Sequence, residues 1–368
     1  MPGVETDPQN LPGLMIAPPI RSFSLCLPPR CPSMSRAIQQ LPRPRFLVLA
    51  CIICIGSHRL LAEPDIGATQ SSKSQSVATA KTNRTTPPKP DHIEAFKKLS
   101  ENDALQLDVF LPDTHPGIGE LASDPDDKSR SSDTLQFPAV VLFFGGGWKG
   151  GNTGHFAPQA KHFAQRGAVV FCPQYRTQSS HQVPPKVCVS DAKSAIRYIR
   201  KNADRFLIDT DRMAVGGGSA GGHLAAATAT VDAFDDPKDD PTISTHSSAL
   251  LLFNPVLDNG PDGGYGHERV RDYWKDFSPA HRVDNDVPPT LVLLGSKDRL
   301  LPVATIRRFE RRLKALDIRC DVHVFEGAEH GFFNRGPAYD ETLQIADDFL
   351  VSLDLLPRPP IRRSNSSP

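Results

Sequence analysis

Residues 214–223 read AVGGGSAGGH, and this stretch decides the fold. It fits two motifs that serve different chemistry. Residues 216–221 match G-x-G-x-x-G, the glycine pattern of dinucleotide-binding folds. Residues 217–221 match G-x-S-x-G, in which Ser219 would occupy a sharp turn between a strand and a helix. Neither pattern is specific alone, so the surrounding sequence must decide.

The sequence on both sides of this stretch alternates between apolar runs of strand length and helical patterns. Leucine and valine alternate with polar residues over 105–111, which predicts a half-buried edge strand. Such alternation of strands and helices predicts an α/β fold, with a mostly parallel sheet covered by helices on both faces. Further strands are predicted at 137–144, 168–172, 212–218, 249–253, 290–295 and 321–327, and helices at 154–166, 189–203, 219–230, 303–316 and about 340–353.

The position of the motif favours the serine turn. A dinucleotide fingerprint opens the first βαβ unit and needs an acidic residue about 20 residues later, at the end of the next strand. Here the motif follows about the fifth strand, and Asp239 and Asp240 lie in a loop, DDPKDDPT. The serine turn needs a strand, small flanking residues and a helix. The sequence supplies all three around Ser219.

A serine hydroxyl is a weak nucleophile until a histidine, oriented by a carboxylate, takes its proton. In folds with this turn the chain order is serine, acid, histidine. Asp298 follows the strand TLVLLG, and His330 follows the last predicted strand. Asp258, which follows the strand ALLLF, is the alternative acid. Asp298 is favoured because it precedes His330 by 32 residues on the adjoining strand.

The oxyanion formed by such an attack needs backbone N–H donors. Ala220, directly after the serine, would supply one. The loop FFGGGWKGG (143–151) follows an earlier strand and would supply others, unless it is only a glycine turn. His223 is expected to cap or pack the helix after the serine. His155 and His162 are expected on a helix surface, with no third metal ligand evident.

These motifs together resemble the α/β-hydrolase fold, and within it the esterase/lipase group that carries an H-G-G-G loop. That group includes hormone-sensitive-lipase-like and acetyl- or feruloyl-esterase-like enzymes. The resemblance covers about 104–353 and rests on FGGGW, GGGSAGGH, GSKDRLLP and EGAEHGFF. It implies that Gly146 and Gly147 act with Ala220 as oxyanion donors. The histidine that normally supports the loop by hydrogen bonds is replaced by Phe144.

The predicted function is hydrolysis of carboxylic esters. Ser219 would attack the carbonyl, His330 would move the proton, and Asp298 would orient His330. No metal or organic cofactor is required. A small-molecule or carbohydrate ester is expected as substrate on the analogy of the family. The alternatives are a serine peptidase of the same fold, which usually brings a further large domain, and a non-catalytic binding module, which usually lacks one of the three residues.

The substrate pocket is harder to predict. Trp148, Tyr175 and Trp274 are candidate lining residues, because aromatic side chains often form such walls. The glycine-rich segment 258–282 is predicted to form a small cap over the site, or alternatively a long ordered loop.

Composition sets limits on the partners and the domain organisation. The 368 residues include 42 basic and 42 acidic side chains, a balance that gives no electrostatic footprint for nucleic acid. Proline-rich and polar stretches predict four parts. These are an N-terminal extension and signal peptide (1–62), a disordered linker (63–90), the catalytic domain (91–357) and a disordered tail (358–368). The sequence gives no prediction of the oligomeric state.

A basic stretch and the 11-residue apolar run 46–56 resemble a secretory signal. Met34 is the predicted start and Ala62 the last residue before cleavage, which predicts a periplasmic or extracellular protein. A short N-terminal membrane anchor is the alternative. Three of the seven cysteines, Cys172, Cys188 and Cys320, lie in the predicted catalytic domain. An odd number excludes a complete disulfide framework but leaves one bridge open.

Overall fold

The structure, a computed structural model, describes residues 86–118 and 136–359. All of them belong to the unit Ala80–Pro368, one of two compact units into which the chain divides. The predicted signal peptide and most of the predicted linker and tail lie outside the described residues.

The central sheet of this unit has eight strands, and most of them are parallel. β1 and β2 pair antiparallel, as do β2 and β4, whereas every pairing from β4 to β8 is parallel. In a parallel sheet the carboxyl ends of the strands meet at one edge, so residues that follow different strands are brought together there. The order across the sheet is β1 (His92–Lys98), β2 (Ala104–Phe110), β4 (Val169–Pro173), β3 (Phe137–Phe143), β5 (Ile208–Gly218), β6 (Ala249–Phe253), β7 (Thr290–Gly295) and β8 (Cys320–Phe325).

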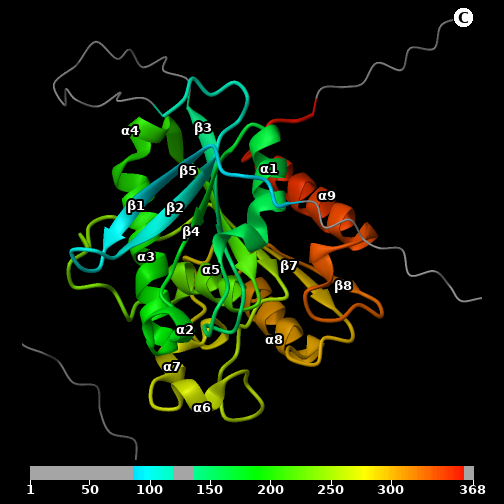
Figure 1. Ribbon diagram of the computed structural model, residues 1–368. Helices are drawn as coiled ribbons and strands as arrows, with labels where there is room; N and C mark the ends of the chain where they lie inside the picture. The colour runs from blue at the N-terminus through cyan, green and yellow to red at the C-terminus, as the bar shows by residue number, and fades with distance from the viewer. Residues whose placement is uncertain (1–85, 119–135, 360–368) are drawn as a thin grey trace, which may run out of the picture. The chain divides into compact units, whose positions relative to one another are not determined.

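Helices cover both faces of the sheet and bury two separate cores (Figure 1). Along β3, Val141 contributes to one core, while Val140 and Leu142 contribute to the other, because successive side chains of a strand point to opposite faces. This explains the continuously apolar sequence of the central strands. One core is closed by α3 (Pro185–Lys201), α5 (Ala220–Thr230) and α8 (Val303–Lys314), the other by α1 (Ala157–Gln165) and α9 (Pro337–Ser352).

Shorter helices lie in the connections. They are the 3₁₀ turn η1 (Thr153–Phe156), α2 (Gln178–His181), α4 (Ala203–Phe206), α6 (His267–Val270), α7 (Trp274–Phe277), and the 3₁₀ turns η2 (Pro279–His281) and η3 (Phe332–Asn334). Three of these, α6, α7 and η2, lie within the 258–282 segment. The segment predicted as a small cap or a long ordered loop is thus ordered and includes three single helical turns.

The α/β fold predicted from the sequence is confirmed. One correction concerns the place of a strand in the sheet, and another concerns the start of a helix. The strand predicted at 105–111 is β2, and it is not an edge strand, because β1 pairs with its outer side. The sequence of β1 does not predict a strand, because only Phe96 in it is buried and Ile93 is 56% exposed. Helix α3 begins four residues before its predicted start, at Pro185, whose fixed φ suits the first helical position.

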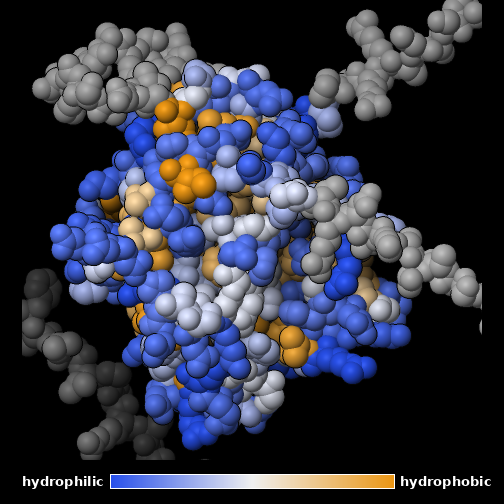
Figure 2. All heavy atoms as spheres, viewed as in Figure 1, coloured by the Kyte–Doolittle hydropathy of each residue, from blue (hydrophilic) through white to orange (hydrophobic). Residues whose placement is uncertain are grey.

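The face of the molecule drawn in Figure 2 is largely hydrophilic, and its hydrophobic residues form small, separate groups. Among the described residues, no helix has both the length and the apolar character needed to cross a membrane. Cys172, Cys188 and Cys320 are buried free thiols, so no bridge forms among them.

Candidate active site

Ser219 lies in the turn between β5 and α5, at the carboxyl edge of the sheet. Its backbone has φ 56° and ψ −117°, a conformation that side-chain-bearing residues rarely adopt and that often marks a functional site. The strained turn is held by neighbouring backbone. Ser219 N–H donates to Phe253 O (3.0 Å), and Ser219 O accepts from Val256 N–H (3.1 Å) and His223 N–H (3.0 Å).

Gly221 allows this turn to pack directly against the end of β3. A Cβ at position 221 would lie 2.1 Å from Phe143 O and 2.4 Å from Phe144 O, far inside van der Waals contact. Only a residue without a side chain fits there. The first turn of α5 therefore touches the point at which β3 continues into the glycine-rich loop (residues 144–151).

Ser219, His330 and Asp298 form a chain of hydrogen bonds. His330 Nδ1–H donates to Asp298 Oδ2 (2.7 Å), because an ionised carboxylate only accepts, and this leaves His330 Nε2 to accept from Ser219 Oγ–H (3.0 Å). The Asp298 side chain is fully buried, and its other oxygen accepts from the N–H groups of Leu300 (2.9 Å) and Leu301 (3.1 Å). The carboxylate is thus fixed in orientation before it meets the imidazole.

Asp258, the alternative acid, lies elsewhere. Its carboxylate contacts His281 (3.1 Å) and Arg308 (3.4 Å), and no contact with His330 is found among the described residues. Burial raises the pKa of Asp258, but the N–H of Gly260 and the side chains of His281 and Arg308 together hold that pKa below its usual value. The geometry therefore favours Asp298.

Asn254 braces the histidine, and sequence reasoning missed it. It follows β6, has φ 36° and is only 1% exposed. Its Oδ1 accepts from Gly331 N–H (3.0 Å), the residue directly after His330. The two residues are 77 positions apart, so no local pattern could have pointed to this contact.

The glycine-rich loop lies beside Ser219. A Cβ at Gly145 would lie 3.3 Å from Ser219 Cβ, and Gly146 and Gly147 have φ of +127° and +61°. Within the described part of the chain, no backbone acceptor is found for the N–H of Gly146 or Gly147. The N–H of Ala220 belongs to the first turn of α5, where helices leave donors unpaired. All three predicted donors thus lie at one edge of the sheet with free N–H groups.

Phe144 stands where the resemblance leads one to expect a histidine, and the start of the glycine-rich loop is supported in a different way. Its ring stacks on Tyr175 (centroids 4.0 Å apart, 13° between planes), and Tyr175 OH donates to Phe144 O (2.7 Å). Tyr175 is buried, and burial raises the pKa of its phenol well above the usual value, so the OH remains a donor. The start of the loop is therefore anchored by a tyrosine.

His223, predicted to cap or pack the helix after Ser219, packs between that helix and the glycine-rich loop. It is fully buried on α5, and its Nε2–H donates to Phe277 O (2.9 Å). Its ring meets Trp148 edge-on, with centroids 4.9 Å apart. Burial lowers the pKa of His223 to about 3, so the imidazole is neutral in the folded protein. His223 thereby joins the helix after Ser219, the glycine-rich loop and the 258–282 segment.

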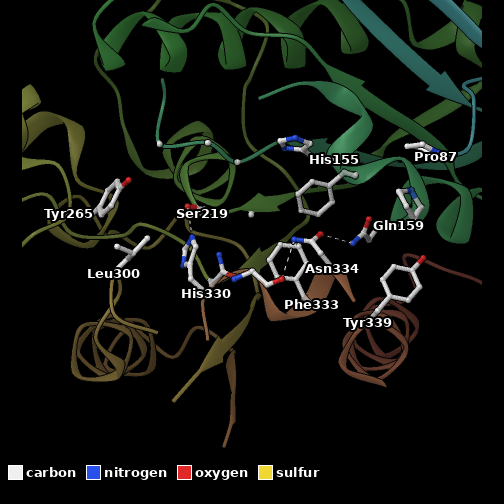
Figure 3. A pocket seen from close by; sticks show the side chains of 18 residues that line it. Pro87, His155, Gln159, Ser219, Tyr265, Leu300, His330, Phe333, Asn334 and Tyr339 are labelled. Atoms are coloured by element: carbon white, nitrogen blue, oxygen red, sulfur yellow. Dashed lines mark hydrogen bonds between the residues drawn. The ribbon is translucent and has the colours of Figure 1, made fainter. Parts of the chain in front are cut away.

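Ser219 and His330 lie in the wall of a cavity of about 810 Å³ (Figure 3). One set of lining side chains is apolar and another is polar, so the cavity can take a substrate with two unlike parts. The apolar set includes Phe156, Phe333, Leu300, Pro87 and Pro158, and the polar set includes His155, Gln159, Asn254, Asn334, Tyr265 and Tyr339.

The three aromatic residues predicted to line the pocket are not among the lining residues, and this prediction is corrected. Trp148 has φ 58° and is 1% exposed, with its ring packed against His223 and Phe277. Tyr175 is buried behind Phe144. Trp274 packs edge-on against His281 within the 258–282 segment. Tyr265 is the aromatic residue that this segment contributes to the cavity.

His155 is a second correction. It was expected on a helix surface with His162, but it lies in η1 and lines the cavity. His162 lies on α1, where its Nε2 is 3.5 Å from Asp347. The apolar pattern of the sequence does not separate the 3₁₀ turn η1 from α1, so the two histidines were predicted on a single helix.

The sheet and this site define an α/β-hydrolase, and comparison with known proteins specifies the class further. Residues 128–259 match the BD-FAE family model, and residues 265–349 match that of the dienelactone hydrolase family. Esterase LipC of Mycobacterium tuberculosis is 32% identical over 239 residues, 56% of each chain. An acetylxylan esterase of Xylanibacter ruminicola is 24% identical over 277 residues, 69% of this chain and 50% of the relative. The chain spans about half the length of the curated relatives it matches.

A solved structure matches this chain over a larger share of both proteins. The propionate-bound structure of esterase 2 from the planctomycete Thermogutta terrifontis is 38% identical, with 73% of this chain and 96% of that chain covered and a TM-score of 0.65. Its butyrate-bound structure is 37% identical, with the same coverage and TM-score. The chain belongs to the esterases of the α/β-hydrolase fold, which are carboxylic ester hydrolases.

The burial of His223 gives a prediction for stability. An unfolded histidine titrates near pH 6.5, so between pH 6.5 and about 3 the unfolded chain binds one more proton than the folded protein. The free energy of unfolding therefore decreases as the pH is lowered through this window. Because of this residue alone, it should be about 2 kcal/mol lower at pH 5 than at pH 8. His223→Gln, which keeps a donor for Phe277 O, should remove most of that difference in urea titrations at the two pH values. His246→Gln, at an exposed position, is the control. An unchanged pH dependence in the first variant would contradict a neutral buried imidazole.

The two candidate acids can be separated by a matched pair of variants. Asp298→Asn should lower kcat/KM for p-nitrophenyl acetate by roughly three to four orders of magnitude, because it removes the acceptor that fixes the His330 tautomer. Asp258→Asn should change it less than about threefold, since that carboxylate contacts His281 and Arg308. The reverse order of effects would assign the role to Asp258.

Proposed function

We propose that the chain hydrolyses short-acyl carboxylic esters through a covalent acyl-enzyme on Ser219. The observation that carries the proposal is the chain of hydrogen bonds from Ser219 Oγ through His330 to the buried Asp298 carboxylate. Each of these residues follows a different strand, and all three meet beside the cavity.

The proposed reaction has two displacements. Ser219 Oγ attacks the ester carbonyl carbon while His330 Nε2 accepts its proton. The negative charge that develops on the carbonyl oxygen is stabilised by the N–H groups of Gly146, Gly147 and Ala220. The tetrahedral intermediate collapses, the C–O bond to the alcohol breaks, and His330 returns the proton to the leaving alkoxide. Water then attacks the acyl-serine with His330 as base and releases the acid and free Ser219.

Asp298 acts through His330. Its carboxylate holds the imidazole with Nδ1 protonated and stabilises the imidazolium that forms in each displacement. Two backbone N–H groups fix Asp298 Oδ1, so the carboxylate need not reorient during the reaction. Preorganised groups of this kind lower the barrier because they cost no rearrangement in the transition state.

Short acyl groups are proposed from the related esterase 2, whose structures hold propionate and butyrate. A carbohydrate ester is a suitable substrate class, because the cavity carries a polar set of side chains, with Gln159 and Asn334 hydrogen-bonded at 3.5 Å (Figure 3). The related acetylxylan esterase supports the same class.

Ester hydrolysis by the full chain tests this proposal. We expect p-nitrophenyl acetate to butyrate to be hydrolysed faster than octanoate, and Ser219→Ala to lower kcat by roughly three to six orders of magnitude. Ser190→Ala, on α3, should leave the activity unchanged. A folded wild-type protein without esterase activity, or activity that survives Ser219→Ala, would overturn the proposal.

We also propose that the protein is exported, with translation starting at Met34 and cleavage after Ala62. The support is the signal-like sequence, which lies outside the described residues. Amino-terminal sequencing of the protein from its native cells should begin at Glu63. A mature amino terminus that retains residues 46–56 would favour the membrane anchor instead.

A further inference from the structure

Arg269 reaches from the 258–282 segment to the glycine-rich loop. It lies on α6, and its guanidinium donates to the carbonyl of Gly147, 122 residues earlier in the chain. Its charged end also lies over two aromatic rings, 5.2 Å from the centroid of Trp148 and 5.7 Å from that of Tyr265. Arg269 itself is not among the residues that line the cavity. Its contacts are therefore with the loop and with Tyr265, which both form the cavity wall.

The glycine-rich loop needs support because its donors must be aligned before the reaction. Gly146 and Gly147 have positive φ, and the absence of side chains leaves their peptide planes free to rotate. A rotated plane would turn an N–H away from the substrate oxygen, and donors that must reorient contribute little to catalysis. Tyr175 anchors only the start of the loop, at Phe144 O. The phenyl ring of Phe144 has no polar atom with which to hold the rest.

The peptide planes on both sides of Gly147 are held by separate hydrogen bonds. The preceding plane carries the Gly147 N–H, and its carbonyl, Gly146 O, accepts from Lys149 N–H (3.0 Å). The following plane carries Gly147 O, which accepts from Arg269. A bond from a charged donor is stronger than one between neutral groups. The first bond sets the direction of the Gly147 N–H, and the bond from Arg269 keeps the next plane from rotating about Gly147.

The surroundings of Gly147 leave it little room to move. A Cβ at this position would lie 2.8 Å from Tyr265 OH and 4.0 Å from an Arg269 guanidinium nitrogen. The next residue, Trp148, is buried against His223 and Phe277. The loop is therefore enclosed by the 258–282 segment on one side and by α5 on the other. Backbone N–H groups of Gln178 and Ser179 bind its later residues, at Trp148 O and Lys149 O, and Arg269 donates to Gly147 O from the 258–282 segment.

We propose that Arg269 is a positioning residue that holds the oxyanion donors of the glycine-rich loop in place. It supplies, from the 258–282 segment, the hydrogen-bond support that the resemblance assigns to a histidine at position 144. This inference rests on the proposed function, since it takes Gly146 and Gly147 to be oxyanion donors. It adds a residue that contacts neither substrate nor Ser219 to the machinery of the reaction.

Three variants of the full chain test the proposal. Arg269→Met keeps an apolar stem of similar length but cannot donate to Gly147 O. Arg269→Lys keeps the charge, but an ammonium cannot lie flat over Trp148 and also reach Gly147 O. Arg271→Met is the matched control, because Arg271 is 64% exposed and pairs only with Glu268 among the described residues.

The expected signature is a loss in the transition state alone. Arg269→Met should lower kcat and kcat/KM for p-nitrophenyl acetate by the same factor, about 10- to 100-fold, with KM unchanged. The inhibition constant of an aryl trifluoromethyl ketone, which forms a tetrahedral oxyanion on the serine, should rise by that same factor. Arg269→Lys should lose about three- to tenfold in both measurements, and Arg271→Met less than about twofold.

Several outcomes would overturn the inference. A kcat within threefold of wild type in Arg269→Met would do so, as would a loss of kcat with an unchanged inhibition constant. If Arg269→Met does not fold, the decision rests on Arg269→Lys, and wild-type values in that variant would reject the proposal. Failure of the proposed function is a separate result, because it would appear as wild-type activity that does not depend on Ser219.

Discussion

The close contact between Gly221 and the end of β3 sets the geometry of the whole site. With 2.1 Å between the position of a Cβ and Phe143 O, the turn that carries Ser219 can approach β3 only if residue 221 has no side chain. This contact places the serine beside the glycine-rich loop, since β3 continues directly into it. The distance between Ser219 and the glycine-rich loop is thereby set by backbone packing rather than by flexible side chains, which is how a rigid site is best built.

The parallel strands extend this constraint to the remaining residues. β5, β6 and β7 lie side by side, so the residues that follow them meet at one edge. The end of β6 and the residues after it support two parts of the site: Phe253 O and Val256 N–H hold the strained Ser219, while Asn254 holds the residue after His330. The strain at Ser219 persists because several bonds fix the same turn. Asp298 is oriented by its own loop, so each reacting group has independent support.

The sequence predicts those parts of the site in which a required residue follows a recognisable strand. Ser219 stands directly after a strand, Asp298 and His330 stand a few residues after theirs, and the glycine-rich loop follows an apolar strand. Burial of a single side chain is not predictable in this way. Trp148 was expected in the pocket, but it is buried in the core. Asn254 and Arg269 act on residues 77 and 122 positions away, so only the folded chain reveals their roles. The strand β1 was missed because its single buried side chain gives no alternating pattern.

The contacts of the 258–282 segment also indicate how substrate reaches Ser219. Phe277 O accepts from His223, Arg269 donates to Gly147 O, and Trp148 lies buried beneath the segment. Lifting the segment would break both hydrogen bonds, leave a neutral histidine without its partner and free the glycine-rich loop from Arg269, so opening on this side would disrupt the site. The opposite rim is different. Pro87 and His155 are exposed there, yet both line the cavity (Figure 3). Entry past these residues leaves every catalytic contact intact, and the 258–282 segment therefore forms a fixed wall of the active site rather than a lid.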